Sequence, residues 1–285
     1  MRILLIHQFF LEDTDGGGSR WNEMSRIWQE LGHEVTVLAG TGHYMGARDS
    51  QKPAKTFEKK RNKDGVVVIR CPVSQGYNDH FMGRMVAYFS FTFSSIWAGL
   101  FHTREEFDAI LVTSPPLFVG ITGLVLSYFK RLPLLFEIRD LWPESAIETG
   151  VLTNPWIIKF AYWFEKLVYK RATLINVLTP AFRMRLISQK KIAPEKIIYI
   201  PNAADFSITE QVVKSFEREV FRQENKLEGK FVLTYVGAHG VANHLEQLLD
   251  AAELLADTNV LFLLIGNGMQ KRQLMEAAQK RKIEN

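Results

Sequence analysis

The sequence predicts an α/β protein with two Rossmann-like units, each built on a doubly wound parallel sheet, the second of them incomplete. Apolar runs of strand length alternate with helical patterns, as they do in such sheets. The alternation restarts after a polar stretch that ends near residue 228, and a glycine-rich turn follows a strand in each unit. With 285 residues, 47% of them hydrophobic, the chain is long enough to fill two cores.

The first unit has seven strand-like runs, and two of its helices have recognisable starts. Asn154-Pro155 and Thr179-Pro180 each place a capping side chain before a proline at the first helical position. Apolar residues at helical spacing, followed by Gly32, indicate a helix between the first two strands. The predicted strands are residues 3–7, 34–39, 66–70, 109–113, 134–138, 173–178 and 197–200.

The second unit repeats the pattern with two strands, residues 231–236 and 260–265, each followed by a loop and a helix. We expect one domain over residues 1–206, a linker helix region over residues 207–228, and a second domain over residues 229–285. A doubly wound sheet needs about five or six strands. We therefore expect the second domain to be the first part of a longer one, and the chain to be truncated.

Charge and cysteine content exclude several classes of protein. Cys71 is the single cysteine, and the acidic residues after the first apolar run do not fit a signal peptide, so we expect a cytoplasmic protein. The net charge of +4 comes without a nucleic-acid module, so no nucleic-acid partner is expected. The basic cluster, expected in a loop that is either solvated or in contact with an anionic membrane, is Lys52, Lys55, Lys59, Lys60, Arg61 and Lys63.

Residues 81–101 are apolar and aromatic, with Arg84 as their only charge. Their length is nominally sufficient to cross a bilayer. Serine and threonine residues dilute the segment, however, and it lies inside the α/β alternation. We expect a helix that is either buried or partly exposed, in which case its aromatic face would lie on a membrane surface.

Gly16-Gly17-Gly18-Ser19-Arg20 directly follows the first strand and opens the first helix. Backbone N–H groups and the helix dipole favour a phosphate or carboxylate at such a position. The spacing lacks the full dinucleotide fingerprint, and no acidic residue ends the second strand. A flexible turn without a ligand is the alternative. Gly266-Asn267-Gly268 repeats the arrangement in the second unit, so two anion-friendly helix starts are expected to face an interdomain cleft.

The densest polar cluster, residues 136–144, follows an apolar strand. Arg139 and Asp140 either pair with neighbours or face the cleft, with the cation on a ligand anion and the carboxylate on a sugar hydroxyl or an attacking oxygen. For Trp142, packing is the favoured interpretation. His7, His239 and His244 lack metal-ligand spacing, and there is no nucleophile elbow or P-loop, so neither a metal site nor a hydrolase is predicted.

Five motifs follow one another along the chain, at residues 16–20, 31–35, 200–205, 235–237 and 266–268. In this order they resemble glycosyltransferase family 4, retaining enzymes of the GT-B fold that transfer a sugar from a nucleotide-sugar donor. The segment at residues 140–144 is most similar to bacterial members that build surface polysaccharides such as O-antigen, capsule or colanic acid on a polyprenyl diphosphate.

The resemblance implies roles for particular residues. Asp140 and Arg139 would be catalytic, at the place where many members carry a histidine. The first domain would bind the lipid-linked acceptor, and the protein would lie on the inner face of the plasma membrane without a metal or other cofactor. Arg20, Trp142 and Glu144 would be on the acceptor side. The donor phosphates would be bound near Gly17, Gly18, Gly237, His239, Gly266 and Gly268.

The sequence departs from the family pattern at three places. The active-site histidine is absent, and Ala238 and Asn243 stand where an arginine and a lysine usually clamp the diphosphate. The paired glutamates that hold the donor would lie beyond Asn285, so we expect no more than trace activity from this chain alone. A nucleotide-sugar epimerase of the same fold and a non-catalytic nucleotide-binding remnant are the alternatives.

Overall fold

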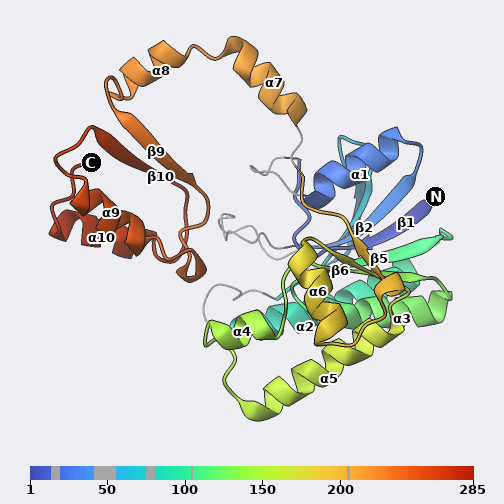
Figure 1. Ribbon diagram of the computed structural model, residues 1–285. Helices are drawn as coiled ribbons and strands as arrows, with labels where there is room; N and C mark the ends of the chain where they lie inside the picture. The colour runs from blue at the N-terminus through green and yellow to red at the C-terminus, as the bar shows by residue number, and fades with distance from the viewer. Residues whose placement is uncertain (14–19, 42–55, 75–80, 104, 204–205) are drawn as a thin grey trace. The chain divides into compact units, whose positions relative to one another are not determined.

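The computed structural model describes residues 1–13, 20–41, 56–74, 81–103, 105–203 and 206–285. The chain divides into two compact units, Met1–Ala204 and Asp205–Asn285 (Figure 1). The glycines of the first predicted phosphate-binding turn, Gly16 to Gly18, lie outside the described residues, as do Ser19, Lys52 and Lys55.

The first unit is built on an eight-stranded sheet in the order β3-β4-β2-β1-β5-β6-β7-β8. All of its neighbouring strands are parallel except β3 and β4. The predicted α/β fold and its parallel sheet are therefore confirmed. The strands are β1 (Arg2–Ile6), β2 (Glu34–Gly40), β3 (Glu58–Arg61), β4 (Val67–Cys71), β5 (Ala109–Ser114), β6 (Leu134–Ile138), β7 (Leu174–Val177) and β8 (Ile197–Tyr199).

Strand β3 corrects the sequence analysis, which places a loop over this part of the basic cluster. Residues Glu58–Arg61 pair antiparallel with β4 at the edge of the sheet, and all four are exposed. An edge strand needs no buried face, so its charged sequence lacks the alternation that marks a strand. Exposed charges at an edge also discourage pairing with another chain.

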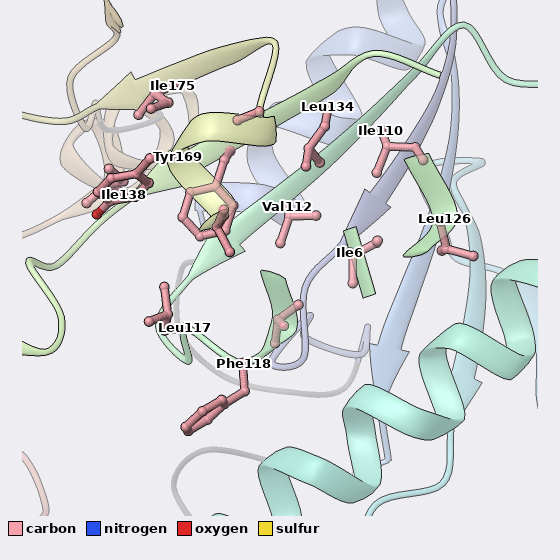
Figure 2. Packing of buried hydrophobic residues seen from close by; sticks show 14 of the residues in the cluster. Ile6, Ile110, Val112, Leu117, Phe118, Leu126, Leu134, Ile138, Tyr169 and Ile175 are labelled. Carbon is pink, nitrogen blue, oxygen red and sulfur yellow. The ribbon is translucent and has the colours of Figure 1, made fainter. Parts of the chain in front are cut away.

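Helices cover both faces of this sheet (Figure 1). Helix α1 (Arg20–Glu30) packs on one face, where Trp21 joins Leu5, Val37 and Leu111 in a buried cluster. The larger cluster fills the opposite face beneath α2 (Phe81–Trp97), α3 (Val119–Lys130) and α5 (Pro155–Arg171), as Figure 2 shows for ten labelled residues. The remaining elements of this unit are the π-helical turn η1 (Ala98–His102), α4 (Glu144–Glu148), α6 (Pro180–Ser188) and η2 (Pro194–Lys196).

The apolar segment at residues 81–101 forms α2 and most of η1, which confirms the predicted helix. Its inner side is buried through Phe91 and Ala98, while Phe93, Trp97 and Phe101 are exposed. In the part of the chain that the structure describes, no helix combines the length and apolarity needed to cross a bilayer.

The two predicted helix caps are present. The side chain of Asn154 accepts hydrogen bonds from the backbone N–H groups of Trp156 and Ile157, at 2.9 and 3.4 Å. Thr179 Oγ1 accepts one from the N–H of Phe182 at 3.1 Å. Each cap therefore satisfies N–H groups that the first turn of a helix leaves without a partner.

The second unit contains a parallel pair of strands, β9 (Phe231–Val236) and β10 (Val260–Ile265). Leu245, Leu249 and Leu274 form its small buried cluster. The predicted linker helix region is divided into two helices. These two helices are α7 (Phe206–Ser215) and α8 (Arg218–Glu224). The other helices of the second unit are η3 (Val241–Asn243), α9 (Glu246–Leu254) and α10 (Lys271–Lys280).

Candidate active site

A row of buried polar side chains crosses the carboxyl edge of the first sheet. Thr113, Glu137 and Asn176 are partners in register on the neighbouring strands β5, β6 and β7, and His7 directly follows β1. All four are at most 5% exposed. Ligands of open α/β sheets bind at the carboxyl ends of the strands, so this row supports the floor of a candidate active site.

Glu137 is the centre of a buried ion-pair cluster. Its Oε2 accepts hydrogen bonds from Arg20 Nε and Nη2, at 3.3 and 3.2 Å, and from Asn176 Nδ2, at 2.7 Å. The side chains of Arg20 and Glu137 are 9% and 1% exposed. Removing two charges from water costs free energy, and here the attraction and hydrogen bonds between the two side chains offset that cost.

The same cluster holds the segment that follows β8. Arg20 Nη1 donates to the carbonyl oxygen of Pro201 at 2.8 Å, and Arg20 Nη2 to that of Ile200 at 3.4 Å. Asn176 Oδ1 accepts from the N–H of Ile200 at 3.0 Å. Arg20 is thus occupied within the protein, and its assignment to the acceptor side stays a prediction.

Two buried oxygens beside this cluster have no hydrogen-bond partner among the described residues. They are Oε1 of Glu137 and Oγ1 of Thr113, which belong to adjacent residues in register. A buried carboxylate oxygen is an acceptor, and a hydroxyl both donates and accepts. Together they can hold a water molecule or a ligand hydroxyl at the edge of the sheet.

Arg139 and Asp140 follow β6 directly, at the edge where the sequence places them. The N–H of Arg139 donates to the carbonyl oxygen of Ser114 at 3.0 Å, which fixes the start of the turn. Arg139 is exposed and Asp140 is half-buried. Within the described residues neither side chain has a hydrogen bond or ion pair with the protein. Both charges are therefore free to contact a ligand.

His7 is held neutral at the same edge. Burial, with a smaller contribution from the positive charge of Arg139, lowers the pKa of the His7 imidazole to about 3. An imidazole that takes up a proton only in the unfolded chain makes folding less favourable as the pH falls below its ordinary pKa. Near neutral pH, His7 can therefore exchange hydrogen bonds with a ligand but carries no charge.

We expect His7→Gln to flatten the pH dependence of stability in mild acid. In the wild type, each pH unit below about 6.5 should remove up to about 1.4 kcal/mol from the free energy of unfolding through this residue. Urea unfolding at several pH values between 7 and 5 measures the slope. The control is His102→Gln at the exposed end of η1. An equal change of slope in both variants would contradict burial as the cause.

Trp142 and Glu144 are held by packing and by an ion pair. The Trp142 ring meets that of Phe118 edge-on at 5.5 Å, against the larger core cluster. Glu144 begins α4, and its Oε1 lies 2.5 Å from Lys190 Nζ, which also contacts Glu165 Oε2 at 2.7 Å. Lys190 therefore fastens α4 to α5. An acceptor-side role for Trp142 and Glu144 stays a prediction.

In the second unit the loops after β9 and β10 pack backbone against backbone. The N–H of Gly237 donates to Ile265 O at 3.0 Å, and the N–H of His239 to Asn267 O at 2.9 Å. A Cβ atom on Gly268 would lie 2.5 Å from the carbonyl oxygen of His239, and one on Gly266 would be still closer to that of Gly237. These glycines are required for the approach of the two loops, whatever they bind.

The His239 imidazole lies between these loops. It is 3% exposed, and neither ring nitrogen has a hydrogen-bond partner in the described part of the chain. Lys271, the first residue of α10, places its Nζ 2.9 Å from the carbonyl oxygen of Gly266. A cation and an unsatisfied imidazole thus stand at a glycine loop before a helix, an arrangement suited to an anion.

Sequence reasoning missed Glu137, Asn176, Thr113 and Lys190 as parts of the site. A signal existed for the first two, because a single carboxylate or amide interrupts the apolar strands LLFEI and LINV. Polar groups buried in strands are hydrogen-bonded. The identity of their partners depends on the order of the strands in space, which the sequence alone does not give.

A sequence profile described as "Glycosyl transferase 4-like domain" matches residues 15–203. The chain belongs to this family. It is 23% identical over 288 residues to the colanic acid biosynthesis glycosyl transferase WcaI of Escherichia coli (strain K12), covering all of this chain and 70% of that protein. The glycosyltransferase WbjE of Pseudomonas aeruginosa is 24% identical over 181 residues, which are 62% of this chain and 43% of WbjE.

Solved structures show the same fold. Anabaena HepE, crystallised with UDP and glucose, superposes with a TM-score of 0.63 at 14% identity, over all of this chain and 67% of HepE. A UDP-N-acetylglucosamine 2-epimerase from Listeria monocytogenes superposes with a TM-score of 0.57 at 11% identity, over 100% and 67% of the two chains. The family 4 glycosyltransferase therefore has the predicted GT-B class of fold.

Proposed function

We propose that the protein is a retaining glycosyltransferase that moves a hexose from a nucleotide-sugar donor to a saccharide on a polyprenyl diphosphate, in the biosynthesis of a surface polysaccharide. Membership of the family 4 glycosyltransferases supports the reaction class. The name of WcaI supports the pathway class, and the UDP and UDP-glucose complexes of HepE support the donor class. The chain spans 70% of WcaI, so the activity proposed is that of the whole protein.

The observation that carries this proposal is the pair of charges at the end of β6. Arg139 and Asp140 are adjacent, lie at the carboxyl edge of the sheet and have no protein partner among the described residues. Asp140 would accept the proton of the attacking hydroxyl, and Arg139 would balance negative charge on the phosphates. A half-exposed carboxylate beside an exposed guanidinium suits both tasks.

The proposed step forms one bond and breaks another at the anomeric carbon. The acceptor oxygen bonds to that carbon, its proton goes to Asp140, and the nucleoside diphosphate leaves with the bonding electrons from the same face. We propose that positive charge from Arg139, together with helix N-termini, stabilises the leaving group without a metal. Transfer assays on the longest natural form of the protein, with a panel of nucleotide sugars and EDTA present, test this reaction.

We expect Gly18→Val to raise the KM for the donor at least about tenfold with a smaller effect on kcat, if backbone at residues 16–18 approaches the diphosphate. Donor affinity measured by calorimetry checks it. Gly32→Val is the control, because Gly32 has a φ of +81° and open space around a Cβ atom. If Gly18→Val lowers the melting temperature as Gly32→Val does but leaves donor affinity intact, residues 16–18 form a plain turn.

An epimerase is the second candidate, favoured by the fold likeness to the Listeria monocytogenes enzyme. It would invert a centre of the nucleotide sugar without an acceptor. Incubation with UDP-N-acetylglucosamine alone, followed by chromatography of the sugars, distinguishes the two. A new epimer in the absence of acceptor would replace the transferase proposal, and donor binding without turnover in either assay would favour the non-catalytic remnant.

A further inference from the structure

We propose that helix α5 docks the first unit on an anionic membrane surface. The contact consists of an aromatic stripe, Trp156, Phe160 and Trp163, and of a lysine stripe, Lys159, Lys166 and Lys170. The inference deepens the proposed function, because it rests on an acceptor that is carried by a lipid. It assigns the contact to a helix other than the one that the sequence indicates.

The aromatic stripe is unusually exposed for its residue types. The exposed fractions are 78% for Trp156, 48% for Phe160 and 58% for Trp163, with the Phe160 and Trp163 rings 5.6 Å apart. Spacings of four and three residues place the three on one side of the helix. Phe160 also stacks on the buried Phe164 at 6.4 Å, which fixes the stripe to the core. Tryptophan and phenylalanine on an amphipathic helix are typical of membrane interfaces.

The exposed charges of α5 are positive, so they favour an anionic partner. Lys159, Lys166 and Lys170 repeat at spacings of seven and four residues, so they line the helix beside the aromatic stripe. All three are exposed. The single acidic residue of α5, Glu165, is 2% exposed and paired with Lys190. The outer surface of α5 is therefore aromatic and positively charged, which complements anionic lipid headgroups.

The direction of α5 relative to the strands places the aromatic stripe at the edge that carries Asp140. The helix begins beyond β6 and α4, on the carboxyl side of the sheet, and ends at Arg171, three residues before β7 starts on the opposite side. Trp156 and Phe160 lie in its first two turns. An acceptor carried by lipid must reach the same edge, so docking through α5 brings the membrane to the site.

Helix α2, which the sequence indicates for this contact, fits less well. Its exposed aromatic residues, Phe93, Trp97 and Phe101, lie at its end and in η1, a few residues before β5 begins. That is the amino edge of the strands, away from Asp140. Of the basic cluster, Lys59 and Lys60 are also paired with Glu105 and Glu12. Substitutions of the exposed aromatic residues of α5 can therefore be compared with the same kind of substitution in α2 and η1.

Co-sedimentation of the 285-residue protein with phosphatidylglycerol–phosphatidylcholine vesicles tests the proposal. We expect wild-type binding that weakens with added salt and is absent with pure phosphatidylcholine. A variant with Trp156→Ser, Phe160→Ser and Trp163→Ser should bind at least about tenfold more weakly, as should one with Lys159→Ala, Lys166→Ala and Lys170→Ala. The matched control, with Phe93→Ser, Trp97→Ser and Phe101→Ser, should bind like the wild type.

Circular dichroism spectra and thermal melts of each variant check that the protein is folded before its binding is compared. Wild-type binding by both α5 variants, or an equal loss in the α2 control, would overturn the proposal. So would a dimer, seen by sedimentation, that the α5 variants abolish, because a second copy would then occupy this surface. Vesicle binding needs no turnover. If the α5 variants lose vesicle binding, the docking proposal is supported even when no sugar transfer is detected. If sugar transfer is detected but vesicle binding does not depend on α5, the docking proposal is refuted and the proposed transferase function is not.

Discussion

Replacement of Glu137 by leucine should lower the free energy of unfolding by about 3–5 kcal/mol, because it leaves the Arg20 guanidinium buried without its counter-charge. Arg20 would keep only the carbonyl oxygens of Ile200 and Pro201, and Asn176 Nδ2 would lose its acceptor. Urea unfolding followed by circular dichroism measures the change. Few single substitutions in the first unit should cost more.

Two companion variants identify the cause. Glu137→Gln retains the shape and one acceptor oxygen, so it should cost less than the leucine variant. In the double variant Arg20→Leu, Glu137→Leu, no charge is left unpaired, so it should recover part of the loss. The exposed pair Arg26–Glu30 provides the control, and Glu30→Leu should cost under about 0.5 kcal/mol. Equal costs for Glu137→Leu and Glu30→Leu would show that burial of the pair contributes nothing.

The Glu137 cluster also forms hydrogen bonds with residues near the end of the first unit. Ile200 and Pro201 lie just before the division at Ala204. Arg20 donates a hydrogen bond to the carbonyl oxygen of each, and Asn176 Oδ1 accepts one from the N–H of Ile200. We therefore expect the Glu137→Leu variant to be cleaved by chymotrypsin at Tyr199 or Phe206 at lower protease concentrations than the wild type. The buried pair in this way fixes the last residues of the first unit beside the candidate site.

The parallel sheet could be predicted from the sequence because its strands are buried on both faces and read as continuous apolar runs. Strand β3 could not, since EKKR at an exposed edge has neither an apolar run nor alternation. The helix starts at Asn154 and Thr179 were predictable because capping is local and needs no knowledge of the fold. The buried strands and the capped helix starts of this fold can thus be predicted from the sequence, whereas its exposed edge strand cannot.

The candidate site divides in the same way. Arg139 and Asp140 could be placed at the carboxyl edge because they directly follow a predicted strand. The partners of Glu137 could not be predicted, because Arg20 is 117 residues away and Asn176 is 39 residues away. That cluster exists only because β7 lies next to β6 and α1 covers the same face. The unsatisfied His239 imidazole likewise depends on two loops whose contact is tertiary.

Asp140→Asn should lower kcat by about 10²–10⁴ in the longest natural form of the protein, because the amide keeps the shape of the side chain but loses its charge and basicity. Asp140 makes no ion pair with the described residues, so its amide should leave the melting temperature within about 1 °C of the wild type. Donor affinity should also change little, because the proposed role lies in the chemical step.

The matched control is Glu148→Gln. Glu148 is an exposed carboxylate at the end of α4, eight positions after Asp140. It lies close in sequence but has no proposed role, so kcat should remain near the wild-type value. A parallel loss of activity and melting temperature in Asp140→Asn would instead indicate a structural carboxylate. The comparison separates a catalytic charge from a general effect on the acidic segment.

The most direct test of the account is therefore the kcat of Asp140→Asn for sugar transfer from the nucleotide sugar that the wild type uses, measured at saturating donor and acceptor beside thermal melts. The account predicts a fall of about 10²–10⁴ with an unchanged melting temperature and unchanged donor affinity. A wild-type kcat in this variant would contradict the assignment of the reaction to the carboxyl end of β6.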